Sequence, residues 1–288
     1  GGPPAGRRPT RTCPMRLVTL NTWKGDGDYR RRLRLIAADL ARLAPDMVCL
    51  QESLCTADGR LDTAGYLARR LGYECAWAPA RYKRRLIEGR SWSCHSGLAM
   101  LARGAIARQG RIALPSHPRD PERLAQWIDI TAQGRRWRFV NLHLTHLRKA
   151  DAIRAEQLDT LLAHLHRNGS PDLVWLCGDF NAAPEDAAMR VLEDRADWGI
   201  ADAYTAAGGR PPGNTHPAGA AGSDGRRIDR VLVLTRNGAR APHFGQASIV
   251  LNTPGTDGVY PSDHAGVLIE TNPRPRGLSN SNRPLTGI

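Results

Sequence analysis

The stretch Leu173-Val-Trp-Leu-Cys-Gly-Asp-Phe-Asn181 is an apolar run that ends abruptly in polar residues. Residues 173–177 are apolar throughout, which is typical of a short strand buried on both faces. Gly178 ends the run, and Asp179 and Asn181 follow two positions apart, so in extended backbone their side chains point the same way. The stretch predicts a buried strand with a carboxylate and a carboxamide at its carboxyl end. The alternative is a strand cap or an Asx turn, which both residue types favour.

The same pattern, a short apolar strand flanked by residues that can handle metals or protons, recurs along the chain. The expected strands are 17–20 before Asn21, 47–50 before Gln51 and Glu52, 138–142 before His143, 231–234 after Asp229, and 265–269 after Asp263 and His264. Active sites of layered α/β folds are assembled from strand ends in this way. The sequence therefore predicts one active site that is shared by several strands.

Taken together, seven motifs resemble those of the endonuclease/exonuclease/phosphatase superfamily and follow that family's order. They are Leu-Asn (20–21), Leu-Gln-Glu (50–52), Ser-Gly-Leu-Ala-Met-Leu (96–101), Asn-Leu-His-Leu (141–144), Gly-Asp-Phe-Asn (178–181), Arg-Ile-Asp-Arg-Val (227–231) and Ser-Asp-His (262–264). The resemblance implies an α/β fold, a four-layer α/β/β/α sandwich of two packed mixed β-sheets flanked by helices. The site would lie at the edge where strand ends from both sheets meet.

The resemblance also implies a metal-dependent hydrolase of phosphodiester bonds. His264 would be the general base that deprotonates the attacking water, and Asp229 would accept its other N–H. Glu52 and Asp263, with Asn21 nearby, would hold the metal. Oxygen ligands without a cysteine cluster suit Mg²⁺, with Mn²⁺ as the alternative, rather than structural Zn²⁺.

Three further residues would act on the phosphate in such an enzyme. Asp179 would orient the nucleophile or assist the leaving group, and Asn181 would donate to the phosphate. His143 would donate to a non-bridging oxygen or protonate the leaving group. Several members of the family orient this histidine with a carboxylate near the start of the strand at 97–101. Here His95 stands there, which leaves the orienting group open, with Glu88 as a distant candidate.

The net charge of the 288-residue chain is +13, which fits a polyanionic substrate held by its phosphates. Basic residues still outnumber acidic ones when the six arginines of residues 1–14 and 271–288 are left out. The segment Arg81-Tyr-Lys-Arg-Arg85 interleaves basic and aromatic side chains, so it is either a phosphate contact or a solvated loop. We therefore predict a nuclease that acts on DNA or RNA.

Two alternatives to a nuclease follow from the same motifs. The first is a phosphodiesterase or phosphatase that acts on a phospholipid head group or an inositol phosphate. Lipid-acting members usually present apolar or aromatic loops to a bilayer, and residues 236–252 contain only Phe244 among aromatics, which disfavours this alternative. The second is a catalytically silent binding module, which conflicts with the complete set of catalytic motifs.

The organisation of the chain is expected to be simple. We predict one catalytic domain over residues 15–270, a disordered N-terminal extension over 1–14 and a disordered basic tail over 271–288. No signal peptide is visible and no apolar stretch approaches the ~20 residues of a membrane span. The six cysteines form no spaced framework, which favours a reducing compartment. We expect a cytoplasmic monomer without stable membrane association.

The helices are expected at about 28–44, 61–71 and 150–165. The first has apolar residues at three- and four-residue spacing, and its arginines, from Arg30 to Arg34, are expected on the solvated side. Further strands are expected near 73–77, 97–101, 106–114 and 126–131, and a turn at 133–134.

Overall fold

The computed structural model describes residues 14–132, 135–219 and 225–272, and its strands form two mixed sheets of six strands each. The first sheet has the order β11-β12-β1-β2-β4-β3 and contains β1 (Arg16–Asn21), β2 (Met47–Thr56), β3 (Glu74–Ile87), β4 (Arg90–Ala102), β11 (Phe244–Val250) and β12 (Gly266–Thr271). The second has the order β5-β6-β7-β8-β10-β9 and contains β5 (Ile106–Ala113), β6 (Leu124–Ala132), β7 (Arg135–His143), β8 (Leu173–Asp179), β9 (Gly199–Asp202) and β10 (Asp229–Thr235).

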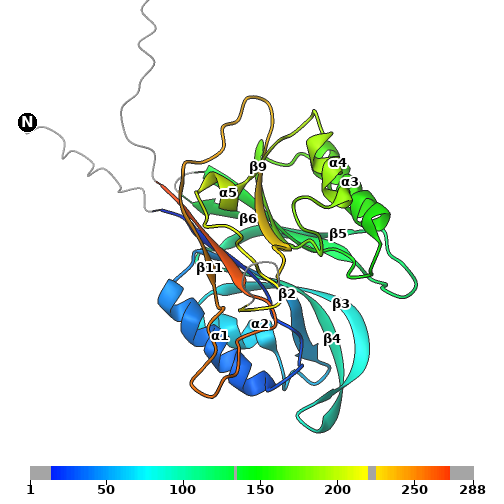
Figure 1. Ribbon diagram of the computed structural model, residues 1–288, viewed down its shortest axis with the longest axis vertical. Helices are drawn as coiled ribbons and strands as arrows, with labels where there is room; N and C mark the ends of the chain where they lie inside the picture. Colours follow the sequence, from blue (N-terminus) through cyan, green and yellow to red (C-terminus); the bar gives the residue numbers. More distant parts are fainter. Residues whose placement is uncertain (1–13, 133–134, 220–224, 273–288) are drawn as a thin grey trace, which may run out of the picture.

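Helices cover the outer face of each sheet (Figure 1). The helical segments are α1 (Tyr29–Leu43), α2 (Thr63–Leu71), α3 (Asp151–Arg167), the short 3₁₀ helix η1 (Ala187–Met189), α4 (Arg190–Glu193) and α5 (Ala203–Ala206). Ile36 of α1 and Leu67 of α2 pack against the first sheet, and Leu161 of α3 packs against the second. None of the helices in the described ranges is long and apolar enough to cross a bilayer.

A third apolar cluster lies between the sheets and joins them. Met47 and Met100 of the first sheet meet Phe139 and Trp175 of the second, and all four side chains are almost fully buried. Apolar residues on both faces of each central strand explain why these strands are continuous apolar runs rather than alternating ones. The layers are α/β/β/α, so the predicted fold class is confirmed.

The strand pairing brings the polar strand ends to one edge of the sandwich. β1 runs parallel to β2 with Asn21 beside Gln51, and β7 runs parallel to β8 with His143 beside Asp179. β10 is antiparallel to β8, which places Asp229 at its start opposite Asp179. The carboxyl ends of β1, β7 and β8, the middle of β2 and the start of β10 therefore converge. β2 does not end before Gln51, as the apolar run suggested, but continues to Thr56.

The structure corrects three further expectations about individual segments. Residues 81–85 are not a loop, because β3 continues through them and pairs with β4 up to Ile87. Residues 236–252 include strand β11, which pairs with β12. Arg30 lies on the exposed side of α1 as expected, but Arg32 is only 2% exposed. The expected turn at 133–134 and most of the two expected disordered ends lie outside the described residues.

Arg32 is buried because the segment between β1 and α1 turns its carbonyl groups inward. The guanidinium donates to the carbonyls of Thr22 and Asp26, both at 2.9 Å, and to that of Pro261 at 3.2 Å. Buried carbonyl groups need donors, and a charged donor makes strong hydrogen bonds to them. Arg32 thus ties the segment after Asn21 to the segment before Asp263.

Gly178 is required by a close approach between β8 and β7. Its φ is +141°, and a Cβ at this position would lie 2.0 Å from the carbonyl oxygen of Leu142. We expect Gly178→Ala to lower the free energy of unfolding by about 3 kcal/mol, through backbone strain and overpacking. Chemical denaturation measures this value. The control is Gly104→Ala, whose Cβ would meet nothing within 4 Å. Equal stability of the two variants would contradict the close packing at Gly178.

Candidate active site

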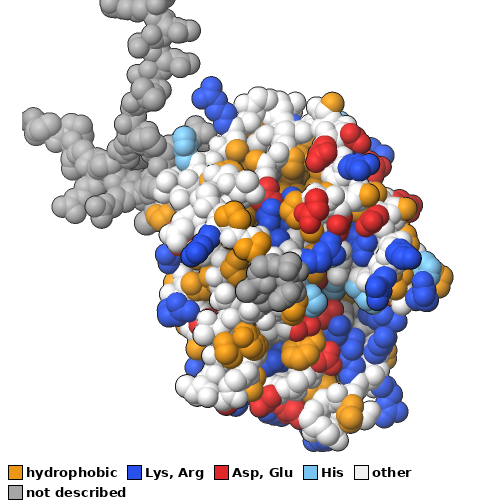
Figure 2. Space-filling model, in the orientation of Figure 1, with side chains coloured by type: hydrophobic (Ala, Val, Ile, Leu, Met, Phe, Trp, Pro, Cys, Tyr) orange, Lys and Arg blue, Asp and Glu red, His pale blue; other side chains and the backbone are white. Residues whose placement is uncertain are grey.

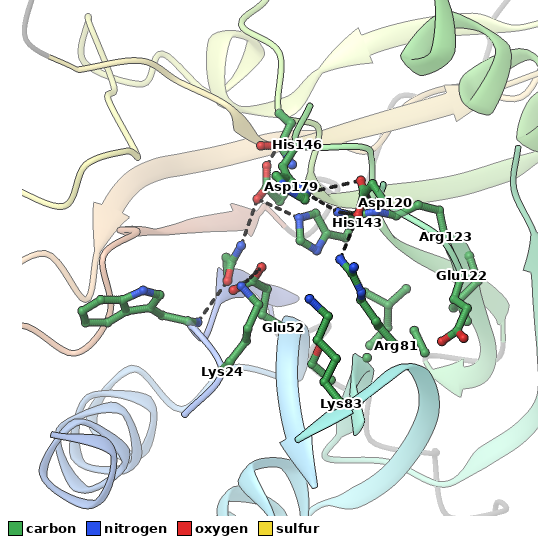
Figure 3. Close-up of a pocket in the computed structure, with 18 of the residues that line it drawn as sticks. Lys24, Glu52, Arg81, Lys83, Asp120, Glu122, Arg123, His143, His146 and Asp179 are labelled. Carbon is green, nitrogen blue, oxygen red and sulfur yellow. Dashed lines mark hydrogen bonds and ion pairs between the residues drawn. The ribbon is translucent and has the colours of Figure 1, made fainter. Parts of the chain in front are cut away.

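The structure brings the eight predicted site residues together at the convergent edge of the two sheets. Seven of them line one pocket (Figure 3), namely Asn21, Glu52, His143, Asp179, Asn181, Asp263 and His264. The eighth, Asp229, is fully buried behind the imidazole of His264. The residues come from both sheets, so the site exists only when the sheets are packed against each other.

His264 and Asp229 form a buried pair. Nδ1 of His264 lies 2.8 Å from Oδ2 of Asp229, and the backbone N–H of Asp229 donates to the hydroxyl of Thr215 at 3.0 Å. Burial opposes the charge of the imidazole, but the carboxylates of Asp229, Asp179 and Asp263 outweigh it and raise the pKa of His264 to about 10. Because Nδ1 faces Asp229, the second nitrogen, Nε2, is the one directed at the pocket.

Asp179 is the central carboxylate of the site. It accepts hydrogen bonds from the side chain of Asn21 at 2.9 Å and from the backbone N–H of Asn181 at 2.8 Å. Nε2 of His143 lies 3.4 Å from its Oδ2, and Nε2 of His264 lies 3.9 Å from the same oxygen. Burial, followed by the neighbouring charge of Asp229, raises the pKa of Asp179.

The two predicted carboxylate ligands, Glu52 and Asp263, both line the pocket and interact electrostatically. The pairing of β2 with β4 is irregular between Leu50 and Ser53, and Glu52 there has a φ of +53°, which turns its side chain out of the strand pattern. Burial raises the pKa of Asp263, and the charge of Glu52 contributes. The ammonium of Lys24 lies 2.6 Å from Oε1 of Glu52. A cationic group thus already balances one of the two carboxylates.

Both carboxamides of the site make hydrogen bonds to the backbone. The oxygen of Asn21 accepts from the backbone N–H of Trp23 at 3.0 Å, which fixes its NH₂ group toward Asp179. The NH₂ group of Asn181 donates to the carbonyl of Leu144 at 3.0 Å. These bonds hold each side chain in one orientation before any ligand binds.

Glu88 does not orient His143. Its carboxylate accepts from Arg30, with Oε2 2.8 Å from the Nε of that arginine, at the end of the β3–β4 hairpin. The contacts of His143 are instead to Asp179, 3.4 Å from its Nε2, and to Arg123, which donates from Nη1 to the backbone carbonyl of His143 at 3.2 Å.

Three residues at the pocket carry no motif that the sequence reveals. Asp120 is 2% exposed and Arg123 lies three positions after it, both between β5 and β6. His216 belongs to a loop, yet its ring centroid lies 4.5 Å from that of His264, and one possible ligand atom of each of His216, Asp263 and His264 lies within 4.8 Å of the other two. None of these three residues belongs to the seven motifs, because their place at the pocket depends on how loops between the strands fold.

Comparison with known proteins identifies the family. The model of the Endonuclease/Exonuclease/phosphatase family matches residues 18–264, so the chain belongs to this family and the predicted resemblance is confirmed. Membership supports a phosphodiesterase or nuclease activity. Among curated proteins, no sequence matches the chain significantly.

Solved structures of the same family share the fold. A family member from Leptotrichia buccalis superposes with a TM-score of 0.71 at 18% identity, covering 90% of this chain and 99% of that one. D. rerio TDP2 in complex with a single-strand DNA product gives 0.67 at 19% identity, covering 90% and 99%. The human Nocturnin catalytic domain with a bound sulfate anion gives 0.66 at 21% identity, covering 91% and 94%. These likenesses establish the architecture.

The Asp229–His264 pair can be tested without any assumption about substrate. We expect Asp229→Asn to lower the pKa of His264 by about 1 to 3, because the nearest opposite charge is removed while burial remains. NMR titration of the imidazole in metal-free protein measures this. Asp159→Asn, which changes an exposed carboxylate paired with Arg195, is the control. A His264 pKa that stays near 10 in Asp229→Asn would show that the pair does not set it.

Proposed function

We propose that this chain hydrolyses phosphodiester bonds of nucleic acid with the help of a divalent cation. The observation that carries the proposal is the buried Asp229–His264 pair, whose free imidazole nitrogen faces Asp179 in the same pocket as Glu52 and Asp263. A histidine fixed by a carboxylate and directed at a polar pocket is the arrangement of a general base.

The donor set fits a divalent cation that prefers oxygen ligands. Glu52 and Asp263 offer carboxylates, and the carboxamide of Asn21 lies in the same pocket. The raised pKa of Asp263 and the ammonium of Lys24 against Glu52 both indicate that positive charge would stabilise these two carboxylates. We propose Mg²⁺, with Mn²⁺ as the alternative. When bound, the cation supplies positive charge that stabilises developing charge on phosphate oxygens and offsets the carboxylates around His264.

His264 and residues of the second sheet would handle the proton and the phosphate. With the charge of the surrounding carboxylates offset in this way, the His264 imidazole would be neutral. Its Nε2 would then take a proton from the attacking water, and Asp229 would stabilise the imidazolium that forms. Asp179 would orient that water, because it lies between His264 and His143 and is itself fixed by Asn21. Asn181 would donate its remaining N–H to a phosphate oxygen.

The environment of His143 favours one of its two predicted roles. Burial, followed by the positive charge of Arg123, holds the pKa of His143 well below its ordinary value. A histidine with such a low pKa is neutral at physiological pH and carries one N–H. We therefore propose that His143 donates a hydrogen bond to a non-bridging oxygen, rather than protonating the leaving group.

Nucleic acid is the substrate that we propose. The basic chain charge favours a polyanion, and a family member of the same fold, D. rerio TDP2, has been solved with a single-strand DNA product. The segment that could have offered an apolar loop to a bilayer contains strand β11 instead. Phospholipid head groups and inositol phosphates remain the alternatives that the activity test separates.

The activity test uses a substrate panel with and without Mg²⁺. The panel contains supercoiled plasmid, single-stranded oligonucleotide, sphingomyelin and a soluble inositol phosphate. We expect cleavage of nucleic acid only with Mg²⁺, and a loss of about a thousandfold or more in kcat for His264→Ala, since removal of a general base abolishes most of the rate. Circular dichroism confirms that the variant is folded.

Two outcomes would contradict the proposal in different ways. Turnover of sphingomyelin or the inositol phosphate, with no cleavage of nucleic acid, would contradict the proposed substrate but leave the proposed roles of the site residues unchanged. Undiminished cleavage by His264→Ala would show that His264 is not the general base.

The cation ligands can be tested by binding alone. Glu52→Gln should weaken Mn²⁺ binding about tenfold or more, because a carboxylate ligand is lost. Lys24→Gln should strengthen it, because the ammonium that competes for Glu52 is removed. Isothermal titration calorimetry of the metal-free proteins measures both changes. The same affinity in both variants would place Glu52 outside the cation site.

A further inference from the structure

One wall of the pocket carries basic side chains that the proposed chemistry does not use. Arg81, Lys83 and Arg85 occupy alternate positions of β3 and all line the pocket. Alternate side chains of a strand point to the same face, so the strand presents them as a row. Arg123 lines the same pocket from the segment before β6. Figure 3 shows Arg81 and Lys83 reaching from β3 toward the space in front of His143.

Lys83 has no carboxylate partner close enough for an ion pair among the described residues. Burial lowers its pKa, and the positive charges of Arg81, Arg85 and Lys24 lower it further. Mutual repulsion of this kind is relieved when an anion binds between the cations. Glu122 belongs to the same wall, but it is exposed and lies on the far side of Arg81 (Figure 3).

The buried carboxylate of Asp120 binds two arginines of this wall, Arg123 and Arg81. Arg123 donates to both of its oxygens, from Nε at 2.9 Å and from Nη2 at 2.8 Å, and the hydroxyl of Thr145 donates at 2.6 Å. Nη1 of Arg81 lies 3.9 Å away. Burial opposes the charge of Asp120, but its partners outweigh burial and hold its pKa well below the usual range. Asp120 therefore stays ionised; it fixes the guanidinium of Arg123 by hydrogen bonds and attracts that of Arg81 through its charge.

Arg123 is also fixed relative to the candidate catalytic residues. Its Nη1 donates to the backbone carbonyl of His143, so the guanidinium of Arg123 is held next to the end of β7 that carries His143. Guanidinium groups match the geometry of phosphate oxygens, and lysine adds a mobile charge beside them. The wall is thus preorganised for an anion that lies next to the reacting phosphate.

We propose that Arg81, Lys83 and Arg123 form a second phosphate-binding subsite, which holds the phosphate adjacent to the scissile one in a polynucleotide strand. This proposal rests on the proposed function and deepens it, since it requires a substrate with at least two phosphates. Asp120 is a positioning residue for the subsite. Figure 2 shows Lys and Arg side chains beside the His side chains on the right of this face of the molecule.

A lipid surface would use different parts of the same hairpin. Tyr82 and Leu86 are 52% and 73% exposed, and they alternate with the row that lines the pocket. The basic side chains that line the pocket therefore belong to the opposite face of β3 from the exposed apolar ones. This division favours a strand threaded through the pocket over a bilayer docked on the hairpin.

The test measures binding of a fluorescent single-stranded oligonucleotide to the His264→Ala protein, so that cleavage does not interfere. Adding Arg81→Gln and Lys83→Gln together should weaken binding about tenfold, and should reduce the slope of log affinity against log salt by about 0.7 for each lost phosphate contact. Arg84→Gln is the matched control. Arg84 directly follows Lys83 on β3, donates to Ser91 at 3.2 Å and does not line the pocket.

A second measurement separates binding from damage to the catalytic centre. In the active protein, the double variant should lose about ten times more kcat/KM on the oligonucleotide than on a chromogenic diester with a single phosphate. Asp120→Asn should shift the same ratio in the same direction, because Arg123 and Arg81 lose their anchor. The single variant Lys83→Gln, at a side chain with no ion pair to break, serves if the double variant fails to fold.

Several results would overturn the subsite. Equal losses in the double variant and Arg84→Gln would show that only general charge matters, while the proposed nuclease function would stand. Equal losses on both substrates would place these residues in the catalytic centre. Loss of binding to anionic phospholipid vesicles, with oligonucleotide binding retained, would indicate a lipid surface. Absence of oligonucleotide binding by the parent protein would overturn the subsite and the proposed substrate together.

Discussion

The site depends on a buried hydrogen-bonded pair, Gln51 and Asn141, that joins the two sheets. Nε2 of Gln51 in β2 donates to Oδ1 of Asn141 in β7 at 2.7 Å, and both residues are fully buried. The NH₂ group of Asn141 then donates to the carbonyl of Leu50 at 2.9 Å. Buried polar groups left unpaired are costly, so this pair resists sliding of one sheet over the other. Glu52 and His143 lie one and two residues farther along, and the bond therefore fixes their separation.

The second constraint is the burial of negative charge at the end of these strands. Asp229 and Asp179 are both almost fully buried and lie opposite each other in the β8–β10 pairing. The raised pKa values of Asp179 and His264 are the response, since one group resists ionisation and the other retains its proton. The ammonium of Lys24 likewise compensates the negative charge of Glu52. Cationic groups of the protein thus neutralise the carboxylates of the candidate cation site only in part.

Sequence patterns predicted those parts of the structure that depend on local periodicity. Buried strands are continuous apolar runs, and the polar residue that ends each run is visible in the sequence, as with Asp179 after residues 173–177. Arg32 and Asp120 were not predicted in their actual places, because their burial depends on carbonyls and cations contributed by distant segments. The far half of β3 was missed since basic residues, rather than apolar ones, occupy its pocket face at residues 81–85. The same dependence on tertiary contacts explains why Glu88 was a wrong candidate.

The two sheets contribute different kinds of side chain to the site, so the geometry of the site depends on how the sheets are aligned. The first sheet brings Asn21, Glu52 and the basic row of β3, which in the proposed mechanism bind a cation or the charge of the substrate. The second brings Asp179, which would orient the water, and Asp229, which would stabilise the imidazolium of His264. His264 joins the two, since it precedes β12 of the first sheet while its Nδ1 contacts Asp229 of the second. A histidine that bridges the sheets, as the proposed general base does, is placed accurately only if the sheets cannot slide, and Gln51 and Asn141 impose that restraint.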